Sequence, residues 1–470
     1  MLIRADEVFH WPNFQKIFTK MKTKIILALL GLVSSIGISQ NTPIKFSLLR
    51  QYDDVDTLKH NPSKNTYQQI KYIPLSKHIS LSFGGSWRLQ YESFFNEQIQ
   101  NSPNQDNLWY LNRVMLHAHL KIKDKFQVFA EVNSSLIRDK DNPSPVDIDE
   151  LAINQIFIKY TFNDHWAIDI GRENLILGSN RLVDLREGPN VRRAFDLTQV
   201  NYHSNTFYAK AFFAIPVKPN PYVFDNDFLE FDETLSALYT TTSLNKTNHL
   251  DAYVFYQKDD NVNYNNAQGN ERRTSLGLRY FGNYKTLKFN NEALYQFGNI
   301  ENQSIRAWTL SMQLENKTKL GKQLYNIGVK SEIISGDKNQ NDNVLNTFDA
   351  LYPSGAYFGR VARFGPSNLI DVHPYINTQF KKIFIEFDYD VFWRHSVNDG
   401  VYNAALLLQY PNTNNERFIG QQVGTIIGYK MNKYINLEFE SNIIFPGSFL
   451  KQSNQSDTLY HFILTTEIKF

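Results

Sequence analysis

The sequence predicts an all-β fold, a transmembrane antiparallel β-barrel of about 18 strands with short periplasmic turns and long extracellular loops. Three observations favour it: apolar and polar residues alternate through most of the chain, short and long connections alternate between the segments, and the average hydropathy is modest. The mean hydropathy is −0.42 although 14% of the residues are aromatic. Barrel strands hide their apolar residues in alternation, so the average stays low while aromatic residues remain abundant.

The segment from Lys382 to Ser396 shows the alternation most clearly. One face carries only apolar and aromatic side chains: Ile383, Ile385, Phe387, Tyr389, Val391 and Trp393. The other face carries four charged side chains and two phenylalanines: Phe384, Glu386, Asp388, Asp390, Phe392 and Arg394. Side chains alternate between the two faces of a strand, and a charged face cannot be buried in a dry core without a large cost. Lipid against the apolar face and water against the charged face therefore suit this segment. Taken alone, this segment also fits a strand of a soluble sandwich.

Segments of this kind follow one another along the chain. They are 79–95, 108–122, 125–135, 151–162, 165–172, 194–203, 206–215, 234–245, 249–258, 272–282, 286–298, 304–317, 323–335, 368–380, 382–395, 417–431, 433–445 and 457–470. The connections after the even-numbered segments are short, as at 123–124 and 204–205. Connections after odd-numbered segments are long and polar: 136–150, 173–193, 216–233, 259–271, 336–367 and 396–416. Outer-membrane barrels are built this way, whereas a soluble sandwich has no reason to alternate so regularly.

Two neighbouring segments keep the alternation poorly. The pattern is weak in 151–162, and in 165–172 the charged Arg172 has the parity of the apolar Ile170. A β-bulge at Gly171 would turn Arg172 toward the lumen.

Inward parity gives the lumen charges of both signs, and a barrel of this size is wide enough for an aqueous channel. The charged residues of inward parity are Arg88, Glu92, Arg113, Glu131, Arg273, Arg279, Lys330, Glu332, Glu386, Asp388, Asp390, Arg394, Glu438 and Glu440. Alternatively, these charged residues form ion pairs across neighbouring strands and serve only to hydrate and stiffen the inner wall of the barrel. An inward position such as Gln296 should accept an arginine at little cost, whereas Ile385→Arg on the lipid face should cost about 2–4 kcal/mol.

The N-terminal region carries a predicted targeting signal. A basic start at Met21 precedes an apolar run, 25–38, that is too short to span a bilayer, and a cleavage site precedes Gln40. Residues before Met21 would then be an upstream extension or, alternatively, a short amphipathic helix with its own role. The predicted divisions are an upstream extension (1–20), a signal peptide (21–39), a periplasmic lead-in (40–78) and the outer-membrane barrel (79–470). Export through the signal peptide predicts that the protein resides in the outer membrane.

Composition narrows the remaining possibilities. The chain has no Cys, which excludes disulfides and thiolate metal sites, and its formal charge of +2 does not suggest nucleic acid as a partner. Asp337, Asp342 and Asp349 do not have the spacing of an EF-hand loop, so neither a metal site nor a cofactor is predicted. Ser396 and His461 are far apart in the sequence, and His461 has inward parity, so a lipase site on the lipid face is not expected and no enzyme is predicted.

Three stretches carry longer motifs. The first comprises 171–174 (GREN), 177–183 (LGSNRLV) and 186–196 (REGPNVRRAFD). The second comprises 336–338 (GDK), 347–348 (TF), 351–353 (LYP), 355–359 (GAYFG), 365–370 (GPSNLI) and Pro374. The third comprises 393–396 (WRHS), 399–402 (DGVY), Gly420 and 445–449 (FPGSF). In this order, over 79–470, the chain resembles the alginate export family of outer-membrane barrels, whose barrel is eighteen-stranded.

The resemblance implies a monomeric, electropositive channel that passes an anionic uronate polymer. It also implies roles for four arginines at its motif positions: Arg172, Arg192, Arg193 and Arg394. Guanidinium groups suit this task because each can donate two parallel hydrogen bonds to a carboxylate and remains charged at every relevant pH. Together with inward parity, the motifs predict a substrate path formed by Arg172, Arg192, Arg193, Arg394, Arg279, Arg113, Asp196, Glu386, Asp388 and Asp390.

Two features depart from the family pattern. Members commonly have Gly after the Phe-Asp pair, whereas Leu197 follows Asp196 here, so the local turn is open to question. The acidic residues Glu386, Asp388 and Asp390 beside the fourth arginine also count against a pore selective for alginate.

The predicted function is an outer-membrane channel for anionic polysaccharides or oligosaccharides, alginate-like uronates among them, or for small anions. The alternatives are a general diffusion porin and a structural or adhesin barrel whose loops 173–193 and 336–367 bind partners; conductance in a planar bilayer separates a channel from an adhesin. The other expected partners are outer-membrane lipid and the barrel assembly machinery, because the last segment ends on Phe470 and resembles the assembly signal of such barrels.

Overall fold

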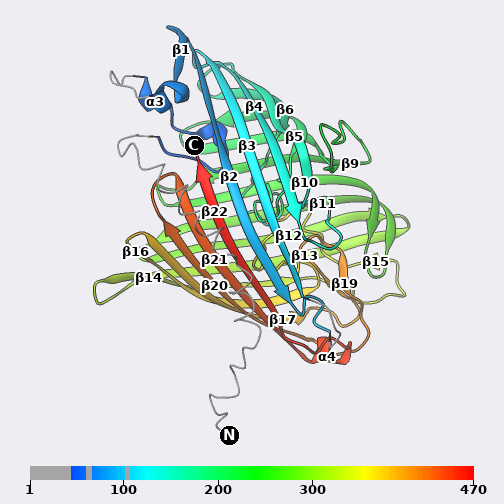
Figure 1. The fold of residues 1–470 in the computed structure, drawn as a ribbon. Helices are drawn as coiled ribbons and strands as arrows, with labels where there is room; N and C mark the ends of the chain where they lie inside the picture. Colours follow the sequence, from blue (N-terminus) through cyan, green and yellow to red (C-terminus); the bar gives the residue numbers. More distant parts are fainter. Residues whose placement is uncertain (1–43, 60–65, 101–105) are drawn as a thin grey trace.

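The computed structural model describes residues 44–59, 66–100 and 106–470 and is a closed antiparallel β-barrel of 18 strands (Figure 1). The first and last barrel strands pair with each other and close the sheet. The predicted number of strands and the antiparallel barrel are confirmed. The predicted extension 1–20 and signal peptide 21–39 lie outside the described residues and stay predictions.

The barrel strands follow the predicted segments closely. They are β2 (Ile79–Phe95), β3 (Asn107–Ile122), β4 (Phe126–Arg138), β5 (Asp149–Thr161), β6 (Trp166–Glu173), β7 (Phe195–His203), β8 (Phe207–Pro216), β9 (Glu233–Ser243), β10 (Asn248–Asn263), β11 (Gln268–Tyr284), β12 (Leu287–Ile300), β13 (Gln303–Leu320), β14 (Gln323–Ile334), β16 (Leu369–Phe380), β17 (Ile383–Arg394), β20 (Phe418–Lys430), β21 (Ile435–Pro446) and β22 (Leu459–Lys469). The largest difference is at the connection predicted over 259–271. There β10 and β11 continue, and only 264–267 remain between them.

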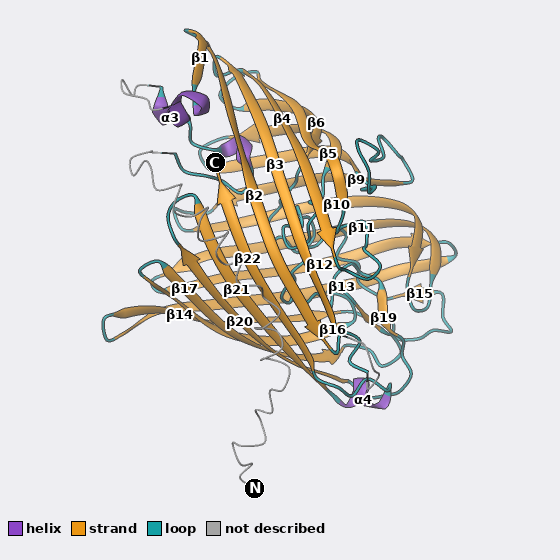
Figure 2. Ribbon diagram, in the orientation of Figure 1, coloured by secondary structure: helices purple, strands orange, loops and turns teal. Residues whose placement is uncertain are grey.

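Few other elements occur among the described residues (Figure 2). They are the 3-10 helices η2 (Arg50–Tyr52) and η3 (Asp56–Leu58), the helices α3 (Thr66–Lys71) and α4 (Ser448–Gln452), and the short strands β1 (Ile73–Ser76), β15 (Val344–Leu345), β18 (Val401–Tyr402) and β19 (Leu408–Tyr410). Among these residues, no helix is both long enough and apolar enough to span a membrane.

The alternation of side chains sets the two faces of the wall. On β17, the apolar Ile385 and Phe387 are 41% and 47% exposed, whereas Asp388 and Asp390 on the opposite face are buried. An exposed apolar face and a buried charged face are the reverse of a soluble protein and typical of a wall between lipid and a polar interior. The face assignment predicted for this strand is confirmed.

The weak alternation in β5 has a local cause. Opposite β4, the register shifts so that Asn154 is an extra residue between Ile153 and Gln155. Asn154 and Gln155 both turn inward and donate to Glu131 Oε1, at 2.7 and 3.1 Å. This β-bulge lets Ile153 and Ile156 both face lipid, where they are 36% and 48% exposed.

No bulge occurs at Gly171, so that expectation is wrong. The pairing of β5 with β6 runs without a shift through Gly171, whose φ is +137°. Arg172 pairs in register with Ile156, which faces lipid, so its side chain stays on the outward face of the wall.

The seam between β2 and β22 is fastened by the segment that precedes the barrel. The Gly85 and Phe470 backbones exchange N–H to O=C hydrogen bonds of 2.7 and 2.9 Å. Arg50 of η2 donates to the carbonyls of both residues, at 2.6 and 3.1 Å, and pairs with Asp53. In Figure 1, α3, β1 and the C-terminus lie at the same end of the barrel, the end with the short turns. The lead-in is thus docked on the periplasmic mouth.

Candidate functional site

Two long connections fold into the lumen instead of standing above it. They are residues 174–194, between β6 and β7, and residues 335–368, between β14 and β16. The two inward loops pair with each other: Asp184 N–H donates to Tyr352 O at 2.9 Å, and Tyr352 N–H donates to Leu182 O at 2.8 Å. Their apolar residues, such as Val183 and Phe348, are buried against the inner wall. The lumen is therefore packed with protein over part of its height.

Three arginines surround one carboxylate of the first inward loop. Arg113 and Arg192 form ion pairs with Glu187, the second at 2.5 Å. Arg88, which is opposite Arg113 in the β2–β3 register, donates to the carbonyls of Glu187 and Pro189, both at 2.7 Å. We call Arg88, Arg113, Arg192 and Glu187 the arginine cluster. With three cations and one carboxylate, it has a net charge of +2.

The arginine cluster has a clear effect on its carboxylate. Burial alone would raise the pKa of Glu187, but the nearby guanidinium groups of Arg113, Arg192 and Arg88 hold that pKa well below its usual range. Glu187 therefore stays charged over the whole pH range in which the barrel would function. Its side chain is 32% exposed, whereas those of the three arginines are at most 5% exposed.

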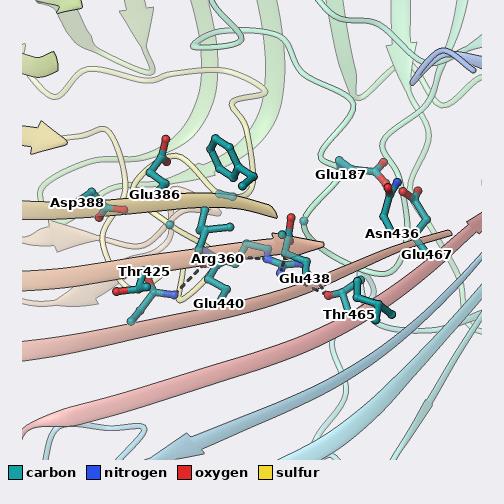
Figure 3. Close-up of a pocket in the computed structure, with 18 of the residues that line it drawn as sticks. Glu187, Arg360, Glu386, Asp388, Thr425, Asn436, Glu438, Glu440, Thr465 and Glu467 are labelled. Atoms are coloured by element: carbon teal, nitrogen blue, oxygen red, sulfur yellow. Dashed lines mark hydrogen bonds and ion pairs between the residues drawn. The ribbon is translucent and has the colours of Figure 1, made fainter. Parts of the chain in front are cut away.

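Arg360 projects into the lumen from the second inward loop, residues 335–368. Arg360 Nε donates to Glu440 Oε2 at 2.6 Å, and its Nη2 donates to Glu438 Oε1 at 3.0 Å. It also lies within 3.3 Å of Gln90 Oε1 and 3.4 Å of Thr465 Oγ1. Figure 3 shows Arg360 between the two glutamates, with Glu386 and Asp388 to one side of it. Arg360 thus ties the loop to the strands β2, β21 and β22.

Carboxylates gather on the wall formed by β16 and β17. His373 lies between Asp388 and Asp390, with Nε2 3.8 Å from one carboxylate and Nδ1 2.5 Å from the other. Their ligand atoms lie within 4.8 Å of one another, close enough for one divalent ion. The imidazole lies within ion-pair distance of both carboxylates, but Asp390 Oδ1 has no hydrogen-bond partner among the described residues. Glu386 lies beyond it and accepts from Asn377 at 2.9 Å.

A cavity of about 610 Å³ lies among these groups. Its cationic lining residues are Arg88, Lys330, Arg360, Lys382 and Lys430. Its anionic lining residues are Glu187, Glu386, Asp388, Glu438, Glu440 and Glu467. Five cations face six carboxylates, so the cavity lining is not electropositive as the family resemblance implies. Instead charges of both signs are intermixed: Arg360 pairs with Glu438 and Glu440 within the lining, and of the arginine cluster only Arg88 and Glu187 reach the cavity.

The lead-in narrows the periplasmic end of the lumen. Gln51 Nε2 lies 3.5 Å from Gln155 Oε1 on the inner wall, and Lys121 pairs with Asp56 at 2.9 Å. A smaller cavity of about 350 Å³ between lead-in and wall is lined by Gln51, Tyr52, Asp53, Asp54, Asp56, Lys121, Gln127, Phe157, Lys159, Asp169 and Glu173. A solute that passes through the barrel must therefore pass this segment or move it.

The predicted site residues fall into three groups. Arg113 and Arg192 belong to the arginine cluster, and Glu386 and Asp388 line the cavity. Arg279 faces inward but is paired with Asp251 at 2.9 Å. The structure brings these residues to the lumen, as predicted from parity and motif position; their roles in passage stay predictions.

Two other predicted residues fasten loops, and a third, Asp390, pairs with neighbouring strands of the wall. Arg394 is fully buried and donates to the carbonyls of Glu416, Val397, Asp399 and Asn414, while its guanidinium lies 4.0 Å from the centre of the Phe449 ring. Arg193 donates to Asp184 O and Pro353 O at 3.2 and 3.1 Å, and so links the two inward loops. Asp390, also fully buried, accepts from Gln422 at 3.2 Å as well as pairing with His373.

Arg172 and Asp196 are not where the prediction placed them. They form a two-pronged pair of 2.7 and 2.9 Å on the outward face of β6 and β7, not in the lumen. The reason is the unbroken register of β6 described above. Leu197, which replaces the glycine common in the family, lies inside β7 and is buried, so no turn is needed there.

Sequence reasoning missed Glu187 and Arg360 as central lumen residues. Both lie in or next to the loop motifs: Glu187 within 186–196, and Arg360 directly after 355–359. Loops have no period from which a face can be read, so only a charged residue inside a long motif could have signalled them.

Comparison with known proteins agrees with this architecture. The sequence profile of the alginate export family matches residues 79–463. No curated protein matches the chain. Among solved structures, OccAB1 of Acinetobacter baumannii is similar with a TM-score of 0.56 and 9% identity, covering 86% of this chain and 100% of that one.

Two structures from Pseudomonas aeruginosa are similar to the same degree. OpdQ has a TM-score of 0.55 and 10% identity, and OpdO has a TM-score of 0.54 and 11% identity; each likeness covers 83% of this chain and 97% of the other. At these identities the likeness concerns the barrel fold alone. The family profile, by contrast, spans nearly the whole barrel, and the chain therefore belongs to the alginate export family and is an outer-membrane channel protein.

Proposed function

We propose that this channel passes anionic solutes, either uronate-type oligosaccharides or small anions. The arginine cluster carries the proposal: three guanidinium groups around the single carboxylate of Glu187 leave a net charge of +2 within the cluster, beside the cavity. Because this excess is held in place by buried contacts, it persists at every pH near neutrality. A fixed positive excess lowers the energy of an anion in the adjacent water.

Arg360 supplies the second step of the argument. One of its partners, Glu440, is 6% exposed, but the other, Glu438, is 44% exposed and points into the cavity. A solute carboxylate of the same geometry is able to replace Glu438 on the guanidinium, since the two are chemically equivalent. Exchange of one carboxylate for another gives binding that is weak enough to release, as passage requires. This carboxylate exchange and membership of the alginate export family both support the uronate class.

A general diffusion porin is the second candidate. The observation that favours it is the balance of five cations and six carboxylates in the cavity lining. A lining in which charges of opposite sign balance gives no strong net field, and so no strong preference for either sign of ion. In that case solute size would govern passage.

The reversal potential of single channels under a salt gradient separates the two candidates. The anion channel predicts that the wild type prefers anions, and that Arg192→Gln reduces the preference at low salt more than at high salt. Arg306→Gln is the matched control, because Arg306 is exposed and opposite the lipid-facing Phe297 in the register. A cation-preferring wild type that Arg192→Gln leaves unchanged would overturn the anion channel.

A further inference from the structure

The connection between β8 and β9, residues 217–232, folds onto the outside of the barrel. Its backbone pairs with the start of β5: Glu150 N–H donates to Pro221 O at 3.0 Å, and Phe224 N–H donates to Leu151 O at 2.8 Å. Asn226 donates to Asp149 at 2.8 Å. We call residues 217–232 the outer flap. It crosses the extracellular ends of β6 and β7, whose own connection turns inward.

The outer flap exposes large apolar side chains, which is unusual for an extracellular loop. The exposed fractions are 66% for Tyr222, 54% for Val223, 57% for Phe224, 70% for Phe228, 44% for Leu229 and 56% for Phe231. Among the charged groups of the flap, Lys218 pairs with Glu230 and Asp232, whereas Asp225 and Asp227 accept from Tyr222 N–H and Asn220. Contiguous exposed apolar surface of this kind marks contact with a membrane or a partner.

The barrel wall is low where the flap lies. With eight residues, β6 is the shortest barrel strand, and at about 3.3 Å per residue it is about 26 Å long. Tilted by about 40°, such a strand covers about 20 Å of the membrane normal, whereas the apolar band of an outer-membrane barrel is about 25 Å tall. The outer flap lies where it can extend the apolar surface of the wall, which at β6 is shorter than the apolar band, into the outer leaflet.

A groove of about 470 Å³ lies between the outer flap and the wall. The wall side includes the lipid-facing Ile156, Ile170 and Phe213, and the flap side includes Phe224 and Phe228. The volume is within the range of small-molecule sites, about 300–1,000 Å³. The groove continues the lipid-facing surface of β5, β6 and β8, so it opens to the acyl region of the membrane.

The Arg172–Asp196 pair closes the polar end of the groove. Arg172 satisfies both oxygens of Asp196 and donates its remaining Nη2 hydrogen to Asp227 O of the flap at 3.1 Å. The pair therefore fastens the flap to the wall and offers little free charge to a ligand. What remains open in the groove is apolar surface, which suits a hydrocarbon chain and not a sugar or an ion.

We propose that the outer flap is embedded in the outer leaflet and that the groove beneath it holds one acyl chain of a membrane lipid. The inference concerns the outer surface of the barrel, and it stands whether or not the lumen prefers anions. It also assigns Arg172 and Asp196, two motif residues, to holding the flap and not to passage.

The depth of the flap is tested with nitroxide labels, since the chain has no native Cys. Phe228→Cys labels the flap, Leu276→Cys labels a lipid-facing strand position that is 47% exposed, and Asn341→Cys labels an exposed position of another long connection. In phosphatidylethanolamine vesicles, the Phe228 label should collide with oxygen more than with a water-soluble nickel chelate, as the Leu276 label does. A Phe228 label that behaves like the Asn341 label overturns the embedding of the flap.

The occupant of the groove is tested by retained lipid. Barrels reconstituted in the same vesicles, then extracted into mild detergent, should keep about one phospholipid per chain in native mass spectrometry. Thr198→Trp fills the groove from an exposed wall position and should abolish retention, whereas Thr274→Trp, on the outward face of β11, should not. Retention that is absent in the wild type, or unchanged in Thr198→Trp, overturns the acyl-chain site. Folding of each variant is verified by the mobility of the unheated barrel in gels.

Discussion

Replacing Glu187 by Gln tests the arginine cluster directly, because this one carboxylate serves three guanidinium groups. The substitution keeps a carbonyl oxygen that still accepts a hydrogen bond, but it removes the negative charge. The net charge of the cluster rises from +2 to +3, and Arg113 and Arg192 lose their only acidic partner within 4 Å among the described residues.

The size of the effect follows from burial. Removing one partner of a fully buried ion pair costs about 3–5 kcal/mol. Glu187, however, is 32% exposed on its side chain, so water screens part of the remaining repulsion. We therefore expect Glu187→Gln to lower the free energy of unfolding by about 1–3 kcal/mol.

The pH dependence has a definite sign. The folded pKa of Glu187 is held below its ordinary value of about 4.5, so the unfolded chain binds the proton more readily. The stability due to this group is full above that value and is lost as the pH falls through the folded pKa. The wild type should lose stability on acidification below about pH 4.5, and Glu187→Gln should lose less over the same window.

Two measurements check this reasoning together. Urea titration of the reconstituted barrel between pH 3 and pH 7 gives the free energies of unfolding, and the reversal potential gives the ion preference. Glu187→Gln should be less stable at pH 7 and more anion-selective, the opposite sign to Arg192→Gln. If its stability equals that of the wild type at pH 7 and shows the same acid loss, the shared carboxylate does not hold the cluster.

Three further predictions concern other parts of the barrel. Ile385→Arg on the lipid face of β17 should cost about 2–4 kcal/mol of unfolding free energy in vesicles; an unchanged value would contradict the orientation of β17. Burial, with Arg50 nearby, lowers the pKa of Lys71 to about 7, so stability should rise from pH 7 to pH 10, and a pH series of unfolding should show no such rise in Lys71→Met. Arg394→Gln removes the donor to the carbonyls of 395–417 and should speed protease cleavage there in intact cells; equal cleavage rates would argue against that anchor.

Most strands were predictable because a membrane wall imposes a period of two, which is broken only locally, as by the β-bulge of β5. In β17, lipid outside and polar groups inside fix every side chain, and the predicted segment 382–395 matches the strand within a residue at each end. Prediction of the strands was poorest where they extend beyond the part of the wall that alternates between lipid-facing and polar residues. Beyond residue 258, β10 continues with polar residues such as Asp259, so hydropathy no longer distinguishes strand from loop.

Parity gave the face of a side chain but not its surroundings. Gln296 faces inward as predicted, yet it is fully buried and bonded to Arg273 at 2.8 Å and to Asp349 of the second inward loop at 2.6 and 3.0 Å. An arginine there would break these contacts, so the small cost expected for Gln296→Arg does not apply to a packed lumen. The positions of loops 174–194 and 335–368 depend on long-range contacts, which leave no local pattern in the sequence.

The contacts of Arg50 impose an order of events on the making of the barrel. Its guanidinium binds the carbonyl of Gly85 in the first barrel strand and that of Phe470 directly after the last barrel strand, 420 residues away. Both acceptors come together only when the last strand has zipped onto the first. The lead-in precedes the barrel strands in the sequence, but it makes both contacts only after β22 has paired with β2. Its docking therefore completes only on a closed barrel. Before β22 pairs with β2, Arg50 has the Gly85 carbonyl but not that of Phe470, so the lead-in is held by one of its two contacts across the seam.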